Sequence, residues 1–180
     1  MYALIVRSLD LIAASLASVA ATPTLAKEPF TFEDYYRGYI MAYGQFQSIA
    51  GLDRRFSVDL YGTWNGRHLN LVEKFKYDDG ERAEKIWYST KTGPGRYGAR
   101  RAVAPAVPKA RIHGNVARYA YPVYLDTKNR KNRVFFHDEL VKLKDGTIHN
   151  TATVFKFLLR VANVQANFAK QRDIRILKRP

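Results

Sequence analysis

A Glu, a Lys and a Trp with hairpin spacing are the residues in this sequence best suited to hold a ligand. Side chains alternate between the two faces of a β-strand, so Glu73 shares a face with Leu71 and Phe75. Further along the chain the same alternation groups Lys85 with Trp87. Pockets for small molecules are mostly apolar, with aromatic side chains and a few polar anchors. An acid, a base and a Trp on apolar strand faces match that description.

The turn between these two segments decides which residues face one another. Residues 77–81 read Tyr-Asp-Asp-Gly-Glu, and a three-residue loop that ends on Gly80 is a common hairpin closure because Gly adopts the left-handed conformation without strain. This loop predicts Glu73 opposite Lys85. A two-residue loop would instead place Lys74 opposite Lys85, a like-charge pair that costs stability. We therefore expect an acid and a base that face each other.

Two interpretations of the charged pair stay open on the sequence alone. The pair can line a ligand pocket, or it can be a structural ion pair or lie at a wet barrel mouth, because an isolated buried charge is expensive. The pocket wall that we predict consists of Glu73, Lys85, Trp87, Leu71, Phe75, Trp64 and Arg101.

Metal and cofactor sites are not indicated. The four histidines are scattered. In one strand only His137 and Glu139 can converge, with His149 joining them if the last long strands pair, whereas zinc needs three or four ligands. The sequence also has no phosphate loop and no Gly-x-Ser-x-Gly motif. We predict no metal and no cofactor.

An enzyme is an alternative that the sequence leaves open. No histidine lies beside a plausible nucleophile. An isomerase or lyase at a barrel mouth could use Glu73 with Tyr88 or Arg101, but strand alternation places Tyr88 on the opposite face from Glu73.

The elements that position these residues are short alternating runs separated by Gly, Pro, Asn and Asp turns. About nine to ten strands follow one another, and a meander with one apolar face must close on itself. We predict an all-β fold: a single antiparallel up-and-down barrel, or a strongly bent sheet, that is lipocalin- or calycin-like. The expected strands cover residues 39–47, 55–63, 68–75, 82–89, 97–103, 109–113, 116–125, 133–143, 147–157 and 161–168.

The first 26 residues have the features of an export signal. Arg7 gives a positive start, an apolar run follows, and small residues precede Lys27, although Asp10 interrupts the pattern. An uncleaved amphipathic start is the alternative. We expect residues 1–26 to be a signal peptide, 27–170 the barrel domain and 171–180 a basic, irregular tail. The predicted location is the periplasm or the envelope, without a lipid-anchor cysteine, since the sequence has no cysteine.

The charge of the chain points to an anionic partner. The net charge is +14 and the isoelectric point is about 10.0. The segment from residue 96 to residue 133 is rich in Lys and Arg and contains a single acidic residue, Asp126. Nucleic acid is not expected, because no recognition motif accompanies the basic segment. Anionic lipid or lipopolysaccharide suits an exported protein, and a plain solvated surface is the alternative. The predicted contacts are Arg100, Arg111, Arg118, Lys128, Arg130 and Lys131.

Several motifs occur in an order that is typical of one family. They include Gly62-Thr63-Trp64, the turn at residues 77–81 and the run Lys91-Thr92-Gly93-Pro94-Gly95. The chain resembles a bacterial envelope family called domain of unknown function 3833, over roughly residues 34 to 170. The resemblance implies a small exported β-protein with a lipocalin-like barrel, and no known activity or catalytic residues.

Three functions are therefore carried forward. The first is a lipocalin-like carrier of a small apolar or amphipathic ligand. The second is an envelope protein that contacts anionic lipid or lipopolysaccharide through its basic surface. The third is the barrel-mouth enzyme. The sequence does not indicate an oligomeric state.

Overall fold

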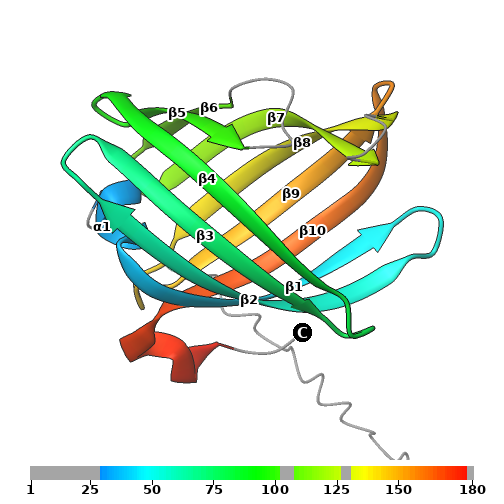
Figure 1. Ribbon diagram of the computed structural model, residues 1–180, viewed down its shortest axis with the longest axis horizontal. Coiled ribbons are helices and arrows are strands. Elements are labelled where there is room, and N and C mark those ends of the chain that lie inside the picture. Colours follow the sequence, from blue (N-terminus) through cyan, green and yellow to red (C-terminus); the bar gives the residue numbers. More distant parts are fainter. Residues whose placement is uncertain (1–28, 102–107, 127–130, 178–180) are drawn as a thin grey trace, which may run out of the picture.

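Alternating apolar and polar residues produce ten antiparallel strands, which the computed structural model shows as a closed barrel (Figure 1). The structure describes residues 29–101, 108–126 and 131–177. Each strand pairs with the next along the chain, and the last pairs with the first. The elements are α1 (Phe32–Tyr36), β1 (Gly38–Ser48), β2 (Asp53–Trp64), β3 (His68–Tyr77), β4 (Arg82–Gly93), β5 (Arg96–Arg101), β6 (Lys109–His113), β7 (Val116–Asp126), β8 (Lys131–Lys142), β9 (Ile148–Lys156), β10 (Leu159–Lys170) and a 3-10 helix, η1 (Gln171–Ile176).

The predicted all-β, up-and-down fold is confirmed, and the barrel is closed rather than an open bent sheet. Closure comes from β1 and β10, whose register runs from Ile40 opposite Lys170 to Ser48 opposite Ala162. A closed sheet pairs the backbone groups that an open sheet would leave exposed at its edges.

The hairpin of β3 and β4 has the predicted register. Glu73 faces Lys85, and Leu71 faces Trp87. The turn is the three-residue loop, because the Tyr77 N–H donates to the Glu81 carbonyl over 2.9 Å, and Gly80 has φ 87°.

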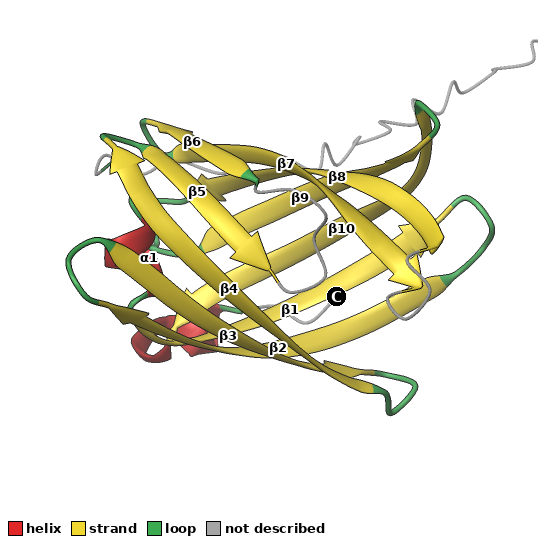
Figure 2. Ribbon diagram, turned by 45° about the horizontal axis from the view of Figure 1, so that its top comes forward, coloured by secondary structure: helices red, strands yellow, loops and turns green. Residues whose placement is uncertain are grey.

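One end of the barrel is closed by the segment that precedes β1 (Figures 1 and 2). Thr31 caps α1 by accepting a hydrogen bond from the Asp34 N–H over 3.2 Å. The helix is held against the strands because the Tyr35 hydroxyl donates to the Phe168 carbonyl over 3.0 Å. Gly62 allows the close approach, since a Cβ there would lie 1.7 Å from the Tyr36 carbonyl oxygen. We call this the closed end, and the opposite end the open end.

The main core lies next to α1. Glu33 on α1 accepts hydrogen bonds from Lys91 and Tyr97, which tie the helix to β4 and β5. The aromatic rings of α1 pack on one another and on Tyr97. The largest fully buried side chains of this core are Tyr97, Phe30, Ile40, Leu60, Leu140 and Ile148. A second buried cluster lies farther from α1 and consists of Tyr121, Val123, Val134, Val154 and Ala162.

The end of the chain is more ordered than the irregular tail expected from the sequence. Residues Gln171–Ile176 form the 3-10 helix η1, which contacts β1 and β10. The expected signal peptide, residues 1–26, lies outside the described residues. Within the described part of the chain, no helix is both long and apolar enough to cross a membrane.

Candidate binding site inside the barrel

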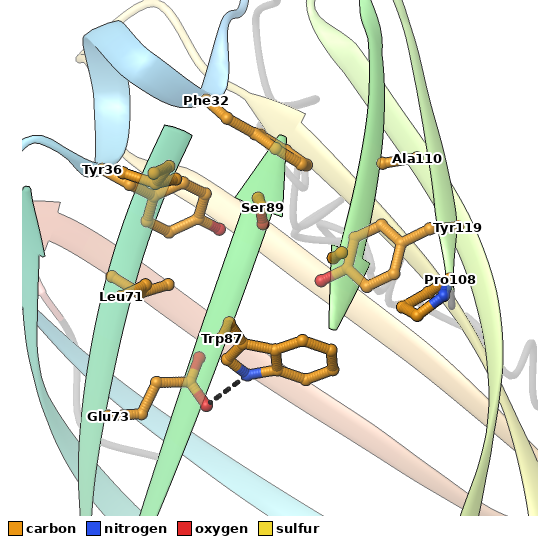
Figure 3. Close-up of a pocket in the computed structure, with 11 residues that line it drawn as sticks. Phe32, Tyr36, Leu71, Glu73, Trp87, Ser89, Pro108, Ala110 and Tyr119 are labelled. Carbon is orange, nitrogen blue, oxygen red and sulfur yellow. Dashed lines mark hydrogen bonds between the residues drawn. The ribbon is translucent and has the colours of Figure 1, made fainter. Parts of the chain in front are cut away.

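A cavity of about 60 Å³ lies inside the barrel, between α1 and Trp87 (Figure 3). Phe32 and Tyr36 of α1 cover it, and Trp87 extends from β4 across its other side. The remaining residues that line it come from β3 to β7 and from Pro108, which precedes β6: Leu69, Leu71, Glu73, Ser89, Ala99, Pro108, Ala110 and Tyr119. The cavity is therefore mostly apolar, with a single carboxyl group.

That carboxyl group is held by the indole of Trp87. Trp87 Nε1 donates to Glu73 Oε2 over 3.1 Å (Figure 3). Burial raises the pKa of Glu73, while the positive charges of Lys85 and Arg101 and the indole hydrogen bond act against this rise. The hydrogen bond orients both side chains, so the indole and the carboxyl group form one unit of the cavity wall.

Glu73 and Lys85 face each other but do not form a direct ion pair among the described residues. Lys85 Nζ lies 3.6 Å from the centroid of the Phe75 ring. Burial lowers the pKa of Lys85 to about 8, and the charge of Glu73 acts against this lowering. The structural ion pair considered from the sequence is therefore not what the structure shows. Lys85 keeps an ammonium group that an anionic ligand could pair with.

Arg101 supplies a second cation to this layer. Its guanidinium carbon lies 5.3 Å from the centroid of the Trp87 ring, and β5 places it directly opposite Trp87. Trp87 also packs edge-on against Tyr121, with the ring centroids 5.3 Å apart. The indole is therefore fixed by a carboxylate, a cation and a second aromatic ring.

A buried polar pair lies across the barrel from this layer. Asn150 Nδ2 on β9 donates to Asp138 Oδ1 on β8 over 3.2 Å. The other oxygens, Asp138 Oδ2 and Asn150 Oδ1, are buried without a hydrogen-bond partner among the described residues. Burial raises the pKa of Asp138 to about 7, and hydrogen bonds from Asn150 and from the Tyr121 hydroxyl act against this rise. Asp138 thus keeps its proton to a higher pH than a free Asp does.

The residues predicted for the pocket wall fall into three groups. Those that line the cavity are Leu71, Glu73 and Trp87. Three more face inward without lining the cavity: Lys85 lies opposite Glu73, Arg101 lies opposite Trp87, and Phe75 is two residues nearer the open end than Glu73. Trp64, by contrast, packs against the core of the closed end and is not among the lining residues.

The residues predicted to contact an anionic surface lie elsewhere. Arg100 and Arg111 are exposed, as is Arg118, whose guanidinium pairs with Glu139 at 2.6 Å. Lys128 and Arg130 lie outside the described residues, and for Lys131 the structure gives only its place at the start of β8.

Several site residues were not predicted from the sequence. Phe32 and Tyr36 belong to α1, and nothing in their sequence neighbourhood indicates which end of the barrel they cover. Tyr119 and Asp138 could have been found by alternation, because they share the inward faces of β7 and β8 with Tyr121 and Leu140. Within the described ranges, no three His, Asp or Glu side chains converge in a way that could hold a metal ion.

Comparison with known proteins places the chain in an uncharacterised group. A family model described as "Protein of unknown function (DUF3833)" matches residues 11–170, which begins earlier than the motifs alone indicated. No curated protein matches the chain. A solved structure that it resembles is an S-type phycobiliprotein lyase from Guillardia theta, with a TM-score of 0.53 and 10% identity over 77% of this chain and 90% of that one. At this identity the likeness supports the lipocalin-like barrel and no shared activity.

Proposed function

The chain belongs to the DUF3833 family of proteins of unknown function, and we propose that it binds a small amphipathic ligand inside its barrel. The observation that carries the proposal is the layer formed by Glu73, Lys85 and Trp87. These polar groups lie among apolar side chains. Glu73 and Lys85 do not form a direct ion pair with each other, so each can interact with a ligand. A mostly apolar site with a few fixed polar groups is the usual form of a small-molecule site.

The charges of the layer favour a ligand with an anionic group. Lys85 and Arg101 supply two positive charges against the carboxylate of Glu73, and burial favours the neutral form of Asp138 by raising its pKa to about 7. The electrostatic interactions are stronger than at the outer surface because Glu73, Lys85 and Arg101 are only partly exposed to water. A carboxylate or phosphate group would pair with Lys85 and Arg101.

The size of the cavity limits where the rest of the ligand lies. A volume of about 60 Å³ holds only a few water molecules. Toward the open end, however, the inward-facing rings of Phe56, Phe75 and Phe136 are only half-buried, so solvent reaches that part of the wall. We infer that the apolar part of the ligand lies against these rings and that it enters from the open end.

The proposed location follows from the sequence. An export signal at residues 1–26 would carry the protein to the periplasm or the envelope, where amphipathic molecules with acidic groups are abundant. Expression with and without residues 1–26, followed by cell fractionation, tests this. Retention of the full-length chain in the cytoplasm would contradict it.

The binding proposal is tested with the anionic aromatic probe 1-anilinonaphthalene-8-sulfonate. Lys85→Met should weaken probe binding about tenfold, which corresponds to the loss of one charge-assisted contact. Affinity of the unchanged protein should also fall as pH rises through about 8, because Lys85 then loses its charge, and this fall should be absent in Lys85→Met. Native mass spectrometry of protein purified from its own cells would identify the natural ligand.

The matched control is Lys74→Met, which removes an exposed lysine on the outer face of the same strand as Glu73. It should bind the probe as the unchanged protein does. Equal weakening by both variants would mean that net charge, and not the interior site, determines binding.

A second candidate function is contact with anionic lipid or lipopolysaccharide, and one feature of the outer surface favours it. Arg96 faces Arg111 across β5 and β6, and Arg111 faces Arg118 across β6 and β7. All three are exposed, and like charges placed directly opposite are destabilising unless an anion lies between them. Arg111→Gln should therefore weaken binding of lipopolysaccharide, measured in a pull-down at increasing salt, if this row of arginines is the contact.

A further inference from the structure

Two neighbouring turns at the open end expose large apolar side chains to solvent. One turn joins β1 to β2 and the other joins β9 to β10, and both project from the end opposite α1 (Figures 1 and 2). The hairpins are joined at their bases, where the Ile49 N–H donates to the Val161 carbonyl over 2.9 Å. We call the exposed set the mouth patch; its residues and exposures are Ile49 76%, Leu52 50%, Phe157 86%, Leu158 95% and Leu159 69%.

The backbone conformation of the β9–β10 turn is unfavourable for the apolar residues that occupy it. Phe157 and Leu158 form a two-residue turn between Lys156 and Leu159, with φ angles of 49° and 69°. This left-handed geometry favours Asn-Gly, and it costs other residues roughly 1 kcal/mol or more each. Bulky apolar residues at both positions therefore destabilise the folded protein through backbone strain and exposed apolar surface, and no contact within the described residues offsets this.

Cations surround the mouth patch. Lys156 and Arg160 flank the turn, and the Lys156 Nζ lies 5.8 Å from the centroid of the Phe157 ring. Arg133 on neighbouring β8 is exposed and lies over the partly exposed ring of Phe135. These basic groups give the apolar tips a positive rim.

Three acids of the β1–β2 and β3–β4 hairpins at this end have side-chain partners. Asp53 accepts hydrogen bonds from Gln45 and Gln47. Asp79 and Glu81 both pair with Arg54. Asp53 keeps its negative charge because the glutamine amides are neutral, and next to the mouth patch it is outnumbered by the cations Lys156, Arg160 and Arg133.

We propose that the mouth patch docks the protein on an anionic phospholipid bilayer. Phe157, Leu158 and Ile49 enter the boundary between headgroups and acyl chains, and Lys156 and Arg160 meet the lipid phosphates. A bilayer fits better than a protein partner, because the apolar groups sit on protruding turns instead of a continuous flat face that another protein could cover. Docking in this way points the open end of the barrel at the lipid, and it holds whether or not the interior binds a ligand.

The test uses vesicles of equimolar phosphatidylcholine and phosphatidylglycerol, with pure phosphatidylcholine for comparison. The double variant Phe157→Asn with Leu158→Gly installs the residues that the turn favours, so it should be at least as stable as the unchanged protein. It should nevertheless lose about tenfold or more of its binding in co-sedimentation, since two large apolar side chains no longer reach the lipid. Binding of the unchanged protein should be stronger to the anionic vesicles and should weaken as salt rises.

Two control variants locate the contact. Ile176→Ser removes an exposed apolar side chain from η1, at the other end of the molecule, and should bind as the unchanged protein does. Arg111→Gln removes a cation from the row of arginines on the outer surface. If Arg111→Gln abolishes vesicle binding and the double variant does not, the row of arginines is the membrane contact and the proposal is wrong.

The absence of cysteine allows a direct measurement of insertion. A polarity-sensitive fluorophore attached to the single cysteine of Leu158→Cys should shift its emission to the blue on anionic vesicles. The same fluorophore on Ile176→Cys should not shift. No binding to either vesicle, or no shift at position 158 when the protein is bound, would overturn the proposal.

Discussion

The two ends of the barrel differ although the same strands run through both. At the closed end the inward positions are apolar and fully buried, as for Ile40, Leu60 and Ile148, and α1 seals them from solvent. At the open end the inward positions differ from one side of the barrel to the other: Val134 and Val154 on β8 and β9 are buried in a second cluster, whereas Phe56, Phe75 and Lys85 on β2 to β4 are only half-buried. One strand pattern thus supports a filled core at the closed end and a partly exposed wall on one side of the open end.

The polar groups divide in the same way. At the closed end Glu33 accepts from both Lys91 and Tyr97, so the carboxyl group that anchors α1 is satisfied. Inside the barrel Lys85 has no direct ion pair with Glu73, and one oxygen of Asp138 has no partner in the described part of the chain. Satisfied groups stabilise the fold, whereas unsatisfied ones cost stability and are where a ligand or water gains most.

The largest expected effect is a difference in stability between truncations of a buried side chain at the closed end and of a half-buried one at the open end. Leu60→Ala removes a fully buried side chain of the closed end and should lower the free energy of unfolding by about 2–5 kcal/mol. Phe56→Ala removes more atoms but from a half-buried ring at the open end, so it should cost about 1–2 kcal/mol. Urea unfolding of both variants measures this. A cost for Phe56→Ala that equals or exceeds that of Leu60→Ala would contradict the division.

An effect of similar size is expected from Asp138, and it depends on pH. The folded state holds the Asp138 proton up to a pKa of about 7, whereas the unfolded chain releases it near the usual value of 3.8. Between these two pH values the folded state binds more protons than the unfolded state. The free energy of unfolding therefore falls as pH rises, and the contribution of Asp138 to this fall reaches about 4 kcal/mol at pH 7.

The variant Asp138→Asn keeps the shape and removes the titration. It should lose less stability than the unchanged protein as pH rises from 4 to 7, in urea unfolding at each pH. Carboxylates with lowered pKa values, such as Asp59 and Glu33, act in the opposite direction, but they are present in both proteins and cancel in the difference. An identical pH dependence in the two proteins would show that Asp138 is ionised in the folded state.

The smallest effect should come from the cap of α1. Thr31→Ala removes the side chain that accepts from the Asp34 N–H, and it should cost about 1 kcal/mol of stability. If ligands enter at the open end, the variant should bind and release 1-anilinonaphthalene-8-sulfonate at unchanged rates in stopped-flow fluorescence. Faster release would mean that the closed end is also a route into the cavity.

Much of the fold could be predicted because the signals that determine it are local. Alternation along each segment identifies the inward residues, and Gly80 in its loop determines that Glu73 faces Lys85. The site was predicted only in part, because the wall of a barrel is assembled from strands far apart in the chain. Asp138 and Asn150, on successive strands, meet through the pairing of β8 with β9, and no local pattern indicates that they share a hydrogen bond.

The sequence by itself determined the strand order, the hairpin register, the alternating faces and the basic balance of this protein, since each depends on neighbouring residues or on composition. The tertiary structure alone decided that α1 seals one end, that Trp87 binds Glu73 while Lys85 turns to Phe75, and that Phe157 and Leu158 stand exposed at the other end. The physical reason is that closing the sheet brings distant strands together, and packing and electrostatics among side chains from different strands then select the partners.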